Sequence, residues 1–171
     1  MISDIYVKIK VFITYIILNS FASSHICPCW LRCKIYNWSG HHVEGKIHSE
    51  CFMGYGPKGH LTLGKGSYCN FRCFFDLGDD ITIGDRCSVA YGVTFCNSTH
   101  EIGDKYQRAG KGVTGAITVG DGCWIGANST ILPGVNIGEG CIIAASSLVK
   151  EDCPPHGLYA GVPAKLIRKL D

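Results

Sequence analysis

The chain has 171 residues, enough for one domain with a hydrophobic core, and its 46% apolar and 18% charged residues are ordinary for a globular protein. Sixteen basic and fourteen acidic residues are dispersed and give a net charge of +2, which argues against a nucleic acid partner. The eleven cysteines are an odd number, and many stand where small apolar residues recur, so we predict reduced core thiols rather than a disulfide framework.

Residues 1–40 are predicted to form a helical segment that caps the rest of the chain. An apolar run from Val11 to Leu18 follows Lys8 and Lys10, a pattern that also occurs in secretory signal peptides. The run is shorter than the about 20 apolar residues of a spanning helix, so we expect no membrane-spanning segment. We favour a helix that packs on the fold or contacts a membrane surface through residues 5–18, and a cleaved signal stays open as the alternative.

Residues 41–153 are predicted to form one domain that is built on a sequence repeat with a period of six. Aliphatic residues recur at every sixth position from Val119 to Val149, often followed by glycine. Ile83, Val89 and Phe95 keep the same frame earlier in the chain, and Leu63 begins a weaker series. A helix needs a period near 3.6 and a half-buried strand a period of 2, so a period of six indicates a short extended segment closed by a turn. Three such segments make a coil of about 18 residues, and stacked coils form a parallel β-helix. We therefore predict an all-β fold.

The repeat is interrupted twice. The interval from Leu63 to Ile83 is 20 residues instead of 18, so two residues are expected to bulge out around Asp76–Asp80. A longer excursion, residues 101–116, leaves the repeat and returns in the same frame. Long loops inside compact domains are commonly functional, so this excursion is a candidate border of a site.

The end of the repeat is predicted at Cys153. Pro154 and Pro155 follow, and proline cannot donate a hydrogen bond to a further coil. The basic residues of the tail, 154–171, predict a helix-like segment that covers the open end of the β-helix.

Three motifs in the second half of the chain are specific: ITVGDGCWIG at 117–126, ILPGV at 131–135 and AGVPAK at 160–165. With them, the chain resembles the hexapeptide-repeat O-acetyltransferases, which include maltose, galactoside and surface-polysaccharide acetyltransferases. The resemblance covers about residues 60–170. It implies a left-handed β-helix, a homotrimer and direct transfer of an acetyl group from acetyl-CoA to a sugar hydroxyl.

The resemblance also implies a catalytic histidine, and His100 stands at the matching position. His100 directly precedes the excursion, where the repeat breaks. A sugar hydroxyl is a weak nucleophile near neutral pH, and a neutral imidazole can take its proton as the hydroxyl oxygen attacks a thioester. We therefore predict His100 as the general base.

Further site residues are assigned on the same resemblance. Asp76 has a turn role as its alternative, and Lys150 stands one position before the lysine of relatives, which on an extended segment turns a side chain to the opposite face. The acceptor side is expected to include Asn70, Asp76 and, on the excursion, Arg108. The coenzyme side is expected to include Trp124, Ala127, Ala145, Lys150, Lys165 and Arg168.

Rival functions are weighed by the residues that they need. A zinc carbonic anhydrase on this fold would need three histidines from neighbouring coils, and none occurs from Ile117 to Pro155, so we expect no catalytic metal. Cys96 as a nucleophile is disfavoured, because direct transfer needs only a ternary complex. Two alternatives stay open: transfer to an amino-sugar nitrogen, and a non-catalytic solenoid that binds partners. We expect a cytoplasmic enzyme, with contact to the membrane surface open.

Overall fold

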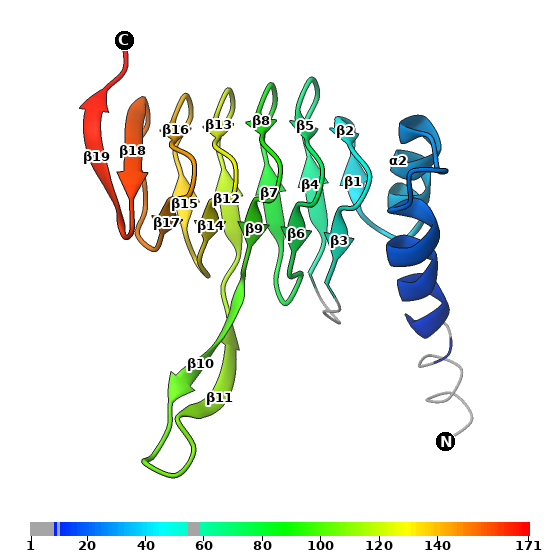
Figure 1. The fold of residues 1–171 in the computed structure, drawn as a ribbon, viewed down its shortest axis with the longest axis horizontal. Coiled ribbons are helices and arrows are strands. Elements are labelled where there is room, and N and C mark those ends of the chain that lie inside the picture. The colour runs from blue at the N-terminus through cyan, green and yellow to red at the C-terminus, as the bar shows by residue number, and fades with distance from the viewer. Residues whose placement is uncertain (1–8, 10, 55–58) are drawn as a thin grey trace.

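The computed structural model describes residues 9, 11–54 and 59–171. It is an elongated parallel β-solenoid with helices at one end and a strand hairpin at the other (Figure 1). Three parallel sheets run along the solenoid, and each coil adds one short strand to each sheet. The prediction of a parallel β-helix with an N-terminal helical segment is confirmed, whereas the handedness of the coil stays a prediction.

The strands of the three sheets follow one another in strict rotation along the chain. The first sheet contains β1 (His42–Val43), β4 (Leu61–Leu63), β7 (Ile81–Ile83), β12 (Ile117–Val119) and β15 (Asn136–Ile137). The second contains β2 (Lys46–Ile47), β5 (Tyr68–Cys69), β8 (Ser88–Val89), β13 (Trp124–Ile125), β16 (Ile142–Ile143), β18 (Gly157–Gly161) and β19 (Ala164–Lys169). The third contains β3 (Phe52–Met53), β6 (Phe74–Phe75), β9 (Thr94–Phe95), β14 (Thr130–Ile131) and β17 (Leu148–Val149).

We name the corners of the solenoid by the sheets that they join. The chain turns from the first to the second sheet at the first corner, from the second to the third at the second corner, and from the third back to the first at the third corner. Turns at the first two corners use left-handed residues, as in Gly122 with φ 67° and Asn128 with φ 57°. Glycine adopts this conformation without strain and asparagine tolerates it, which fits the turn residues of the repeat.

The core is the aliphatic ladder that the period of six builds. Each two-residue strand points one side chain outward and one inward, as in exposed Trp124 and buried Ile125, and the three-residue strands β4, β7 and β12 point two inward. Phe75 and Phe95 stack in register with ring centroids 5.3 Å apart. A Cβ added to Gly126 would lie 2.4 Å from the backbone nitrogen of Ala145, so a glycine after the aliphatic residue lets the coils approach closely.

Coil length differs along the solenoid as the sequence interval predicts. Thr62 of β4 pairs with Thr82 of β7, 20 residues on, whereas Thr118 of β12 pairs with Asn136 of β15, 18 residues on. The third corner at 76–80 holds the additional residues of the longer coil. The predicted bulge is therefore confirmed.

The cysteines are core thiols, as predicted. All eleven are free, and eight of them are buried. Cys87, Cys123 and Cys141 follow one another at the first corner, each as the small residue that faces inward after the turn. Cys29 and Cys33 of the helical segment donate to the carbonyls of Ile47 and Gly45, at 3.5 and 3.6 Å, so these thiols hold the helices to the first coil.

The N-terminal cap consists of helical residues 11–16, η1 (Ile17–Ala22) and α2 (Cys29–Trp38). Asn19 exchanges two hydrogen bonds with the backbone of Met53, at 2.8 and 2.9 Å. Arg32 is only 3% exposed. Its guanidinium donates at 2.5 to 2.8 Å to the carbonyls of Ala22, Ser24, Cys27 and Ile47. In the described part of the chain, no helix is both long enough and apolar enough to cross a membrane.

The C-terminal tail corrects two expectations. β18 and β19 form an antiparallel hairpin where a helix-like tail was predicted. The solenoid also continues past Cys153, because Cys153 bridges to Ile137 and β18 pairs in parallel with β16. The tail is too short for a stable isolated helix, and pairing with the exposed edge of the second sheet satisfies its backbone instead.

His41, at the join between α2 and β1, makes the stability of the fold depend on pH. Its side chain is 7% exposed, and its Nδ1 accepts a hydrogen bond from the backbone of Leu61 at 3.1 Å. Burial, followed by the charges of His60 and His42, lowers the pKa of His41 from 6.5 to about 4. The unfolded chain therefore binds a proton at pH values where the folded chain does not.

Acidification from pH 7.5 to pH 5 is expected to lower the free energy of unfolding by about 2 kcal/mol through His41 alone. The loss begins below pH 6.5 and levels off below pH 4, because there both states carry the proton. Urea unfolding of wild type and His41→Gln at the two pH values measures how much the free energy of unfolding of each protein changes with pH. His100→Gln, which alters an exposed histidine that does not act on His41, should keep the wild-type dependence of the unfolding free energy on pH. The same pH dependence in wild type and His41→Gln would contradict this role.

Candidate active site

His100 lies on a hairpin that projects from the third corner. Its strands are β10 (Ser98–Ile102) and β11 (Ala109–Thr114), which pair in antiparallel register between β9 and β12. Figure 1 shows this hairpin standing away from the solenoid wall. His100 pairs with Gly112 near the base, and its side chain is exposed. The excursion is thus an ordered hairpin that begins at Ser98, three residues before the predicted loop.

Asp76 fastens the base of the hairpin. Its carboxylate accepts hydrogen bonds from the backbone N–H of Ser98, at 2.9 Å, and from the Ser98 hydroxyl. Buried Asn97 accepts from the backbone N–H of Gly78 at 2.9 Å, and Thr114 donates to Asp79 at 3.2 Å. The bulge at 76–80 therefore holds both strands of the hairpin, which fixes the backbone two residues before His100. This contact with the hairpin is neither the turn role nor the acceptor contact expected for Asp76, and the acceptor contact stays a prediction.

Asn70 lies at a different place, the second corner. It lines a cavity of about 440 Å³ with His25, Glu50, Phe71, Arg72 and Tyr91. The Oδ1 atom of Asn70 accepts a hydrogen bond from the backbone N–H of Phe71 at 2.8 Å, so this contact does not use the NH2 group of the Asn70 amide. The cavity thus combines hydrogen-bonding groups with two aromatic side chains, Phe71 and Tyr91.

A hydrogen-bonded chain of polar side chains borders this cavity. The hydroxyl of Ser49 lies 2.8 Å from His25 Nδ1, and His25 Nε2 lies 2.9 Å from Glu50 Oε1. Arg72 Nε donates to Glu50 Oε2 at 2.6 Å. The hydrogen bond from Arg72, followed by that from His25, lowers the pKa of Glu50, so the carboxylate is ionised near neutral pH. Sequence reasoning did not single out His25, Glu50, Arg72 or Tyr91.

Three residues of the predicted coenzyme side lie on or beside the second sheet. Trp124 on β13 is 55% exposed and points off the wall, as expected from its place between two inward residues. Ala127 and Ala145 stand one coil apart at the second corner, where the backbone N–H of Ser146 donates to the Ala127 carbonyl at 2.8 Å. Ala127 and Ala145 therefore follow one line along the second corner, where Asn70 also lies, and Trp124 stands on the adjoining sheet.

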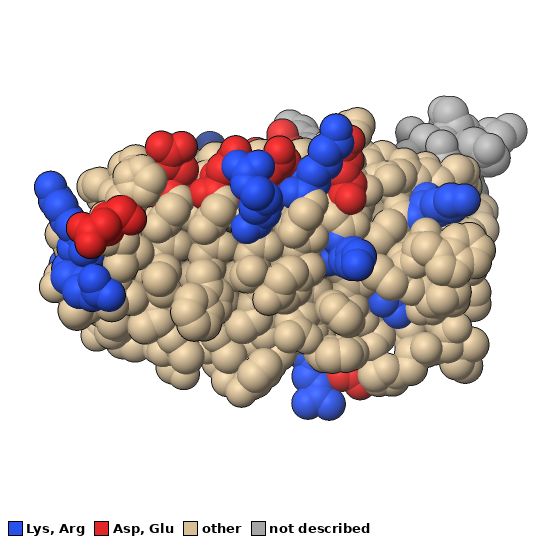
Figure 2. Space-filling model, turned by 90° about the horizontal axis from the view of Figure 1, so that it is seen from above, with Lys and Arg blue, Asp and Glu red and all other residues tan. Residues whose placement is uncertain are grey.

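Charged side chains are unevenly spread over this face. Figure 2, which looks onto the second sheet, shows a broad area with few charges between the cap and the C-terminal hairpin, and a group of basic side chains at the hairpin end. A row of both signs runs along one edge of this face. At the first corner, Asp85 and Arg86 belong to one coil and Asp121 to the next, where Asp121 pairs with Arg86. An anionic ligand on this face would therefore find its positive charge at the C-terminal hairpin.

The predicted basic residues differ in their surroundings. Lys150 and Lys165 both reach Glu151, at 3.2 and 3.7 Å, and they lower the pKa of that carboxyl, Lys150 more than Lys165. Arg168 lies on β19 in register with Leu158. Arg108 stands at the far end of the β10–β11 hairpin, where its carbonyl accepts from the backbone N–H of Gly103 at 2.9 Å. Lys150 and Lys165 converge on one spot, and Arg108 is remote from it.

A single chain therefore splits the predicted site into two groups. His100, Asp76 and Arg108 belong to the third corner and its hairpin, while Asn70, Ala127 and Ala145 belong to the second corner. The whole third sheet lies between these corners. The chain brings Asp76 to the base of the hairpin that carries His100, and it does not bring Asn70 to the same place.

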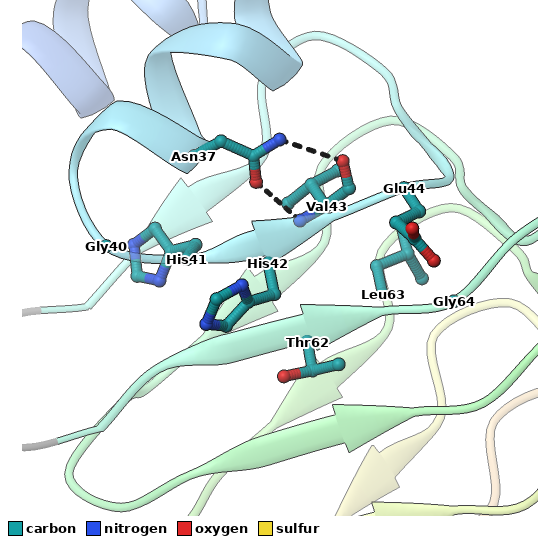
Figure 3. A pocket seen from close by; sticks show the side chains of 9 residues that line it. All are labelled: Asn37, Gly40, His41, His42, Val43, Glu44, Thr62, Leu63 and Gly64. Carbon is teal, nitrogen blue, oxygen red and sulfur yellow. Dashed lines mark hydrogen bonds between the residues drawn. The ribbon is translucent and has the colours of Figure 1, made fainter.

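A second cavity, of about 300 Å³, lies between α2 and the first sheet. Figure 3 shows Asn37 holding both backbone polar groups of Val43, with His42 and Thr62 side by side on β1 and β4. None of the predicted site residues lines this cavity. Within the described residues, no three His, Cys, Asp or Glu side chains are grouped as a metal site.

Comparison with known proteins relates this arrangement to acetyltransferases. The family described as "Bacterial transferase hexapeptide (six repeats)" matches residues 116–151. A Staphylococcus aureus (strain MRSA252) protein named as an acetyltransferase is 40% identical over 111 residues, which are 65% of this chain and 56% of that protein. The galactoside O-acetyltransferase of Escherichia coli (strain K12) is 34% identical over 125 residues, 73% of this chain and 61% of the relative. The chain thus aligns with little more than half the length of these relatives.

Solved structures agree over nearly the whole chain. A maltose O-acetyltransferase from Clostridium difficile 630 superposes with a TM-score of 0.78 at 27% identity, covering 95% of this chain and 85% of that chain. A galactoside acetyltransferase in complex with coenzyme A gives 0.77 at 28% identity, covering 95% and 80%. A hexapeptide-repeat acetyltransferase from Vibrio cholerae, complexed with acetyl coenzyme A, gives 0.69 at 25% identity, covering 94% and 85%.

Proposed function

Because this chain belongs to the hexapeptide-repeat acetyltransferase family, close to the maltose and galactoside O-acetyltransferases, we propose that it transfers an acetyl group from acetyl-CoA to a hydroxyl of a saccharide or saccharide-like acceptor. The observation that carries the proposal is the placement of His100. Its imidazole is exposed on an ordered hairpin whose base is fastened by Asp76.

In the proposed reaction, the acceptor oxygen attacks the thioester carbonyl carbon of acetyl-CoA as His100 takes the hydroxyl proton. The carbon–sulfur bond then breaks, coenzyme A leaves as the thiolate, and the proton on His100 returns to the sulfur. The products are the acetyl ester and free coenzyme A. General-base assistance of this kind contributes typically about two to four orders of magnitude in rate.

The two groups of site residues support a homotrimer. His100 at the third corner of one chain would face Asn70 at the second corner of its neighbour, so that each site is completed between two chains. The coenzyme would then extend along Trp124, Ala127 and Ala145 toward the basic C-terminal hairpin. Lys165 and Arg168 on β19 would lie near its phosphates, with Lys150 beside Lys165 at Glu151.

The cavity at the second corner suits a saccharide acceptor. Glu50, Arg72 and His25 offer a carboxylate, a guanidinium and an imidazole, and Asn70 adds an amide. Phe71 and Tyr91, 41% and 54% exposed, offer ring faces on which the apolar side of a sugar can rest. The donor acetyl-CoA and the eleven free thiols fit an enzyme of the reducing cytoplasm.

The test is acetyl transfer by the purified protein to a panel of glucosides, galactosides, maltose, longer oligosaccharides and amino sugars. The acetylated product should be followed by mass spectrometry, because eleven thiols would react with a thiol reagent. Ester formation on a hydroxyl supports the proposal, whereas amide formation would show transfer to nitrogen instead. Absence of acetyl-CoA binding by calorimetry would overturn it and leave a non-catalytic solenoid.

A further inference from the structure

The first helical segment is apolar on both of its sides. On one side, Leu18 and Ala22 are buried against the rest of the fold. On the other, Ile9, Phe12, Ile13 and Ile16 follow the spacing of one helical stripe, and they are 43% to 62% exposed. A helix that is apolar all round is normally buried, so the outer stripe is expected to have a covering of its own.

The second helix continues this apolar surface. Trp30 and Trp38, eight residues apart on one face of α2, are 64% and 70% exposed. An apolar groove joins the two helices and is lined by Ile17, Phe21, Lys34, Ile35 and Trp38. We call the exposed residues Ile9, Phe12, Ile13, Ile16, Phe21, Trp30 and Trp38 the apolar end; they belong to the cap, at the end of the solenoid opposite the C-terminal hairpin (Figure 1).

The charge of this region is of one sign. Between Asp4 and Glu44 the sequence contains no acidic residue, whereas the rest of the chain holds all fourteen. The same interval contains Lys8, Lys10 and Lys34, and also Arg32, whose guanidinium is buried within the cap. The Nζ of Lys34 lies 5.4 Å from the ring centroid of Trp30, so a cation stands within the apolar end itself.

We propose that the apolar end docks on the surface of a lipid bilayer that contains anionic lipid. Isoleucine and phenylalanine side chains would enter the boundary between headgroups and acyl chains, and the two tryptophans would lie at headgroup depth, where aromatic rings are enriched. Lysines near the surface each contribute about 1 kcal/mol of attraction to an anionic leaflet. The absence of carboxylates between residues 4 and 44 removes the repulsion that such a surface would otherwise meet.

A second copy of the chain is the competing cover for this surface. Two such surfaces would place the basic residues of one chain against those of the other, and residues 5–43 contain no acidic side chain to pair with them. An anionic lipid surface meets the same residues with opposite charge. Charge complementarity therefore favours the bilayer over self-association.

The proposal does not rest on the proposed enzymatic function, and vesicle co-sedimentation of the full chain tests it directly. We expect binding to vesicles of phosphatidylcholine with phosphatidylglycerol, at least tenfold weaker binding to phosphatidylcholine alone, and weaker binding to the anionic vesicles in high salt. The triple variant Phe12→Gln, Ile16→Gln, Trp30→Gln should lose at least tenfold in partitioning. The matched control Ile102→Gln, Tyr106→Gln removes two residues that are 90% and 86% exposed on the β10–β11 hairpin, and it should bind as wild type does.

Circular dichroism establishes that the triple variant is folded, and sedimentation velocity reports its assembly. Equal partitioning of wild type and the folded triple variant would overturn the proposal. Equal binding to both vesicle types would overturn recognition of anionic lipid. If wild type binds no vesicles and the triple variant has a smaller oligomer mass than wild type, a second copy of the chain covers the apolar end and the proposal is wrong.

Discussion

Replacement of His100 by alanine is expected to lower kcat for acetyl transfer by about two to four orders of magnitude, the usual contribution of a general base. The KM for acetyl-CoA should change little, because the imidazole acts on the acceptor proton and the coenzyme is expected to lie along Trp124 and the second corner. Initial rates of acetylated product at varied acetyl-CoA concentration, with an acceptor found in the panel, measure both constants.

Two further variants make the result for His100 specific. His42→Ala removes an exposed histidine on the first sheet and should leave kcat unchanged. Asp76→Asn keeps the size of the side chain but weakens its hydrogen bonds to Ser98, so we expect an intermediate loss of kcat through the position of the hairpin. A His100→Ala enzyme with wild-type kcat would show that His100 is structural and that the proposed proton transfer is wrong.

Replacement of Arg32 by methionine is expected to lower the free energy of unfolding by about 3 kcal/mol or more. The guanidinium is buried and donates to four backbone carbonyls, three in the cap and one in the first coil. Methionine fills similar space and donates nothing, so buried carbonyls lose their partner, at about 1–3 kcal/mol for each acceptor that water cannot reach. Urea unfolding at fixed protein concentration measures the change.

Arg86→Met is the matched control for Arg32. Arg86→Met is the same substitution at an exposed position of the first corner. There the guanidinium of Arg86 forms an ion pair with Asp121 at 3.7 Å. Exposed pairs of this kind contribute about 0–1 kcal/mol, so Arg86→Met should unfold nearly as wild type does. Equal losses in the two variants would contradict the role of Arg32 in fastening the cap.

The solenoid was predictable because its signal is repeated in every coil. Inward residues recur every six positions, and residues one coil apart, such as Ile125 and Ile143, are eighteen positions apart. Many positions therefore predict the same coil geometry. The tail was mispredicted because the segment Ala164–Lys169 is not part of the repeat, and its basic composition also suits a helix. This strand depends on pairing with the open edge of β18, which itself pairs with β16, and local sequence does not show that edge.

The candidate site was predictable only in part, for a related reason. His100 could be found because the repeat breaks there, and the break is visible in the sequence. The hydrogen-bonded residues Ser49, His25, Glu50 and Arg72 could not be found from the sequence. His25 belongs to the cap and meets Ser49 and Glu50 only because the cap docks on the first coil, and Glu50 meets Arg72 only because the coils stack. The one available signal was weak: Glu50 and Arg72 hold equivalent left-handed corner positions in successive coils.

The β10–β11 hairpin leaves and rejoins the solenoid at a single point. Ser98 pairs with Thr114, the backbone N–H of Gly115 donates to the Asn97 carbonyl at 3.0 Å, and Ile117 keeps its register with Ile81. The coil closes as it would without the intervening residues. Insertions, deletions or exchanges at the tip, beyond His100, are therefore expected to leave the aliphatic ladder undisturbed. The tip can then vary among related chains without cost to folding or to the position of the proposed general base.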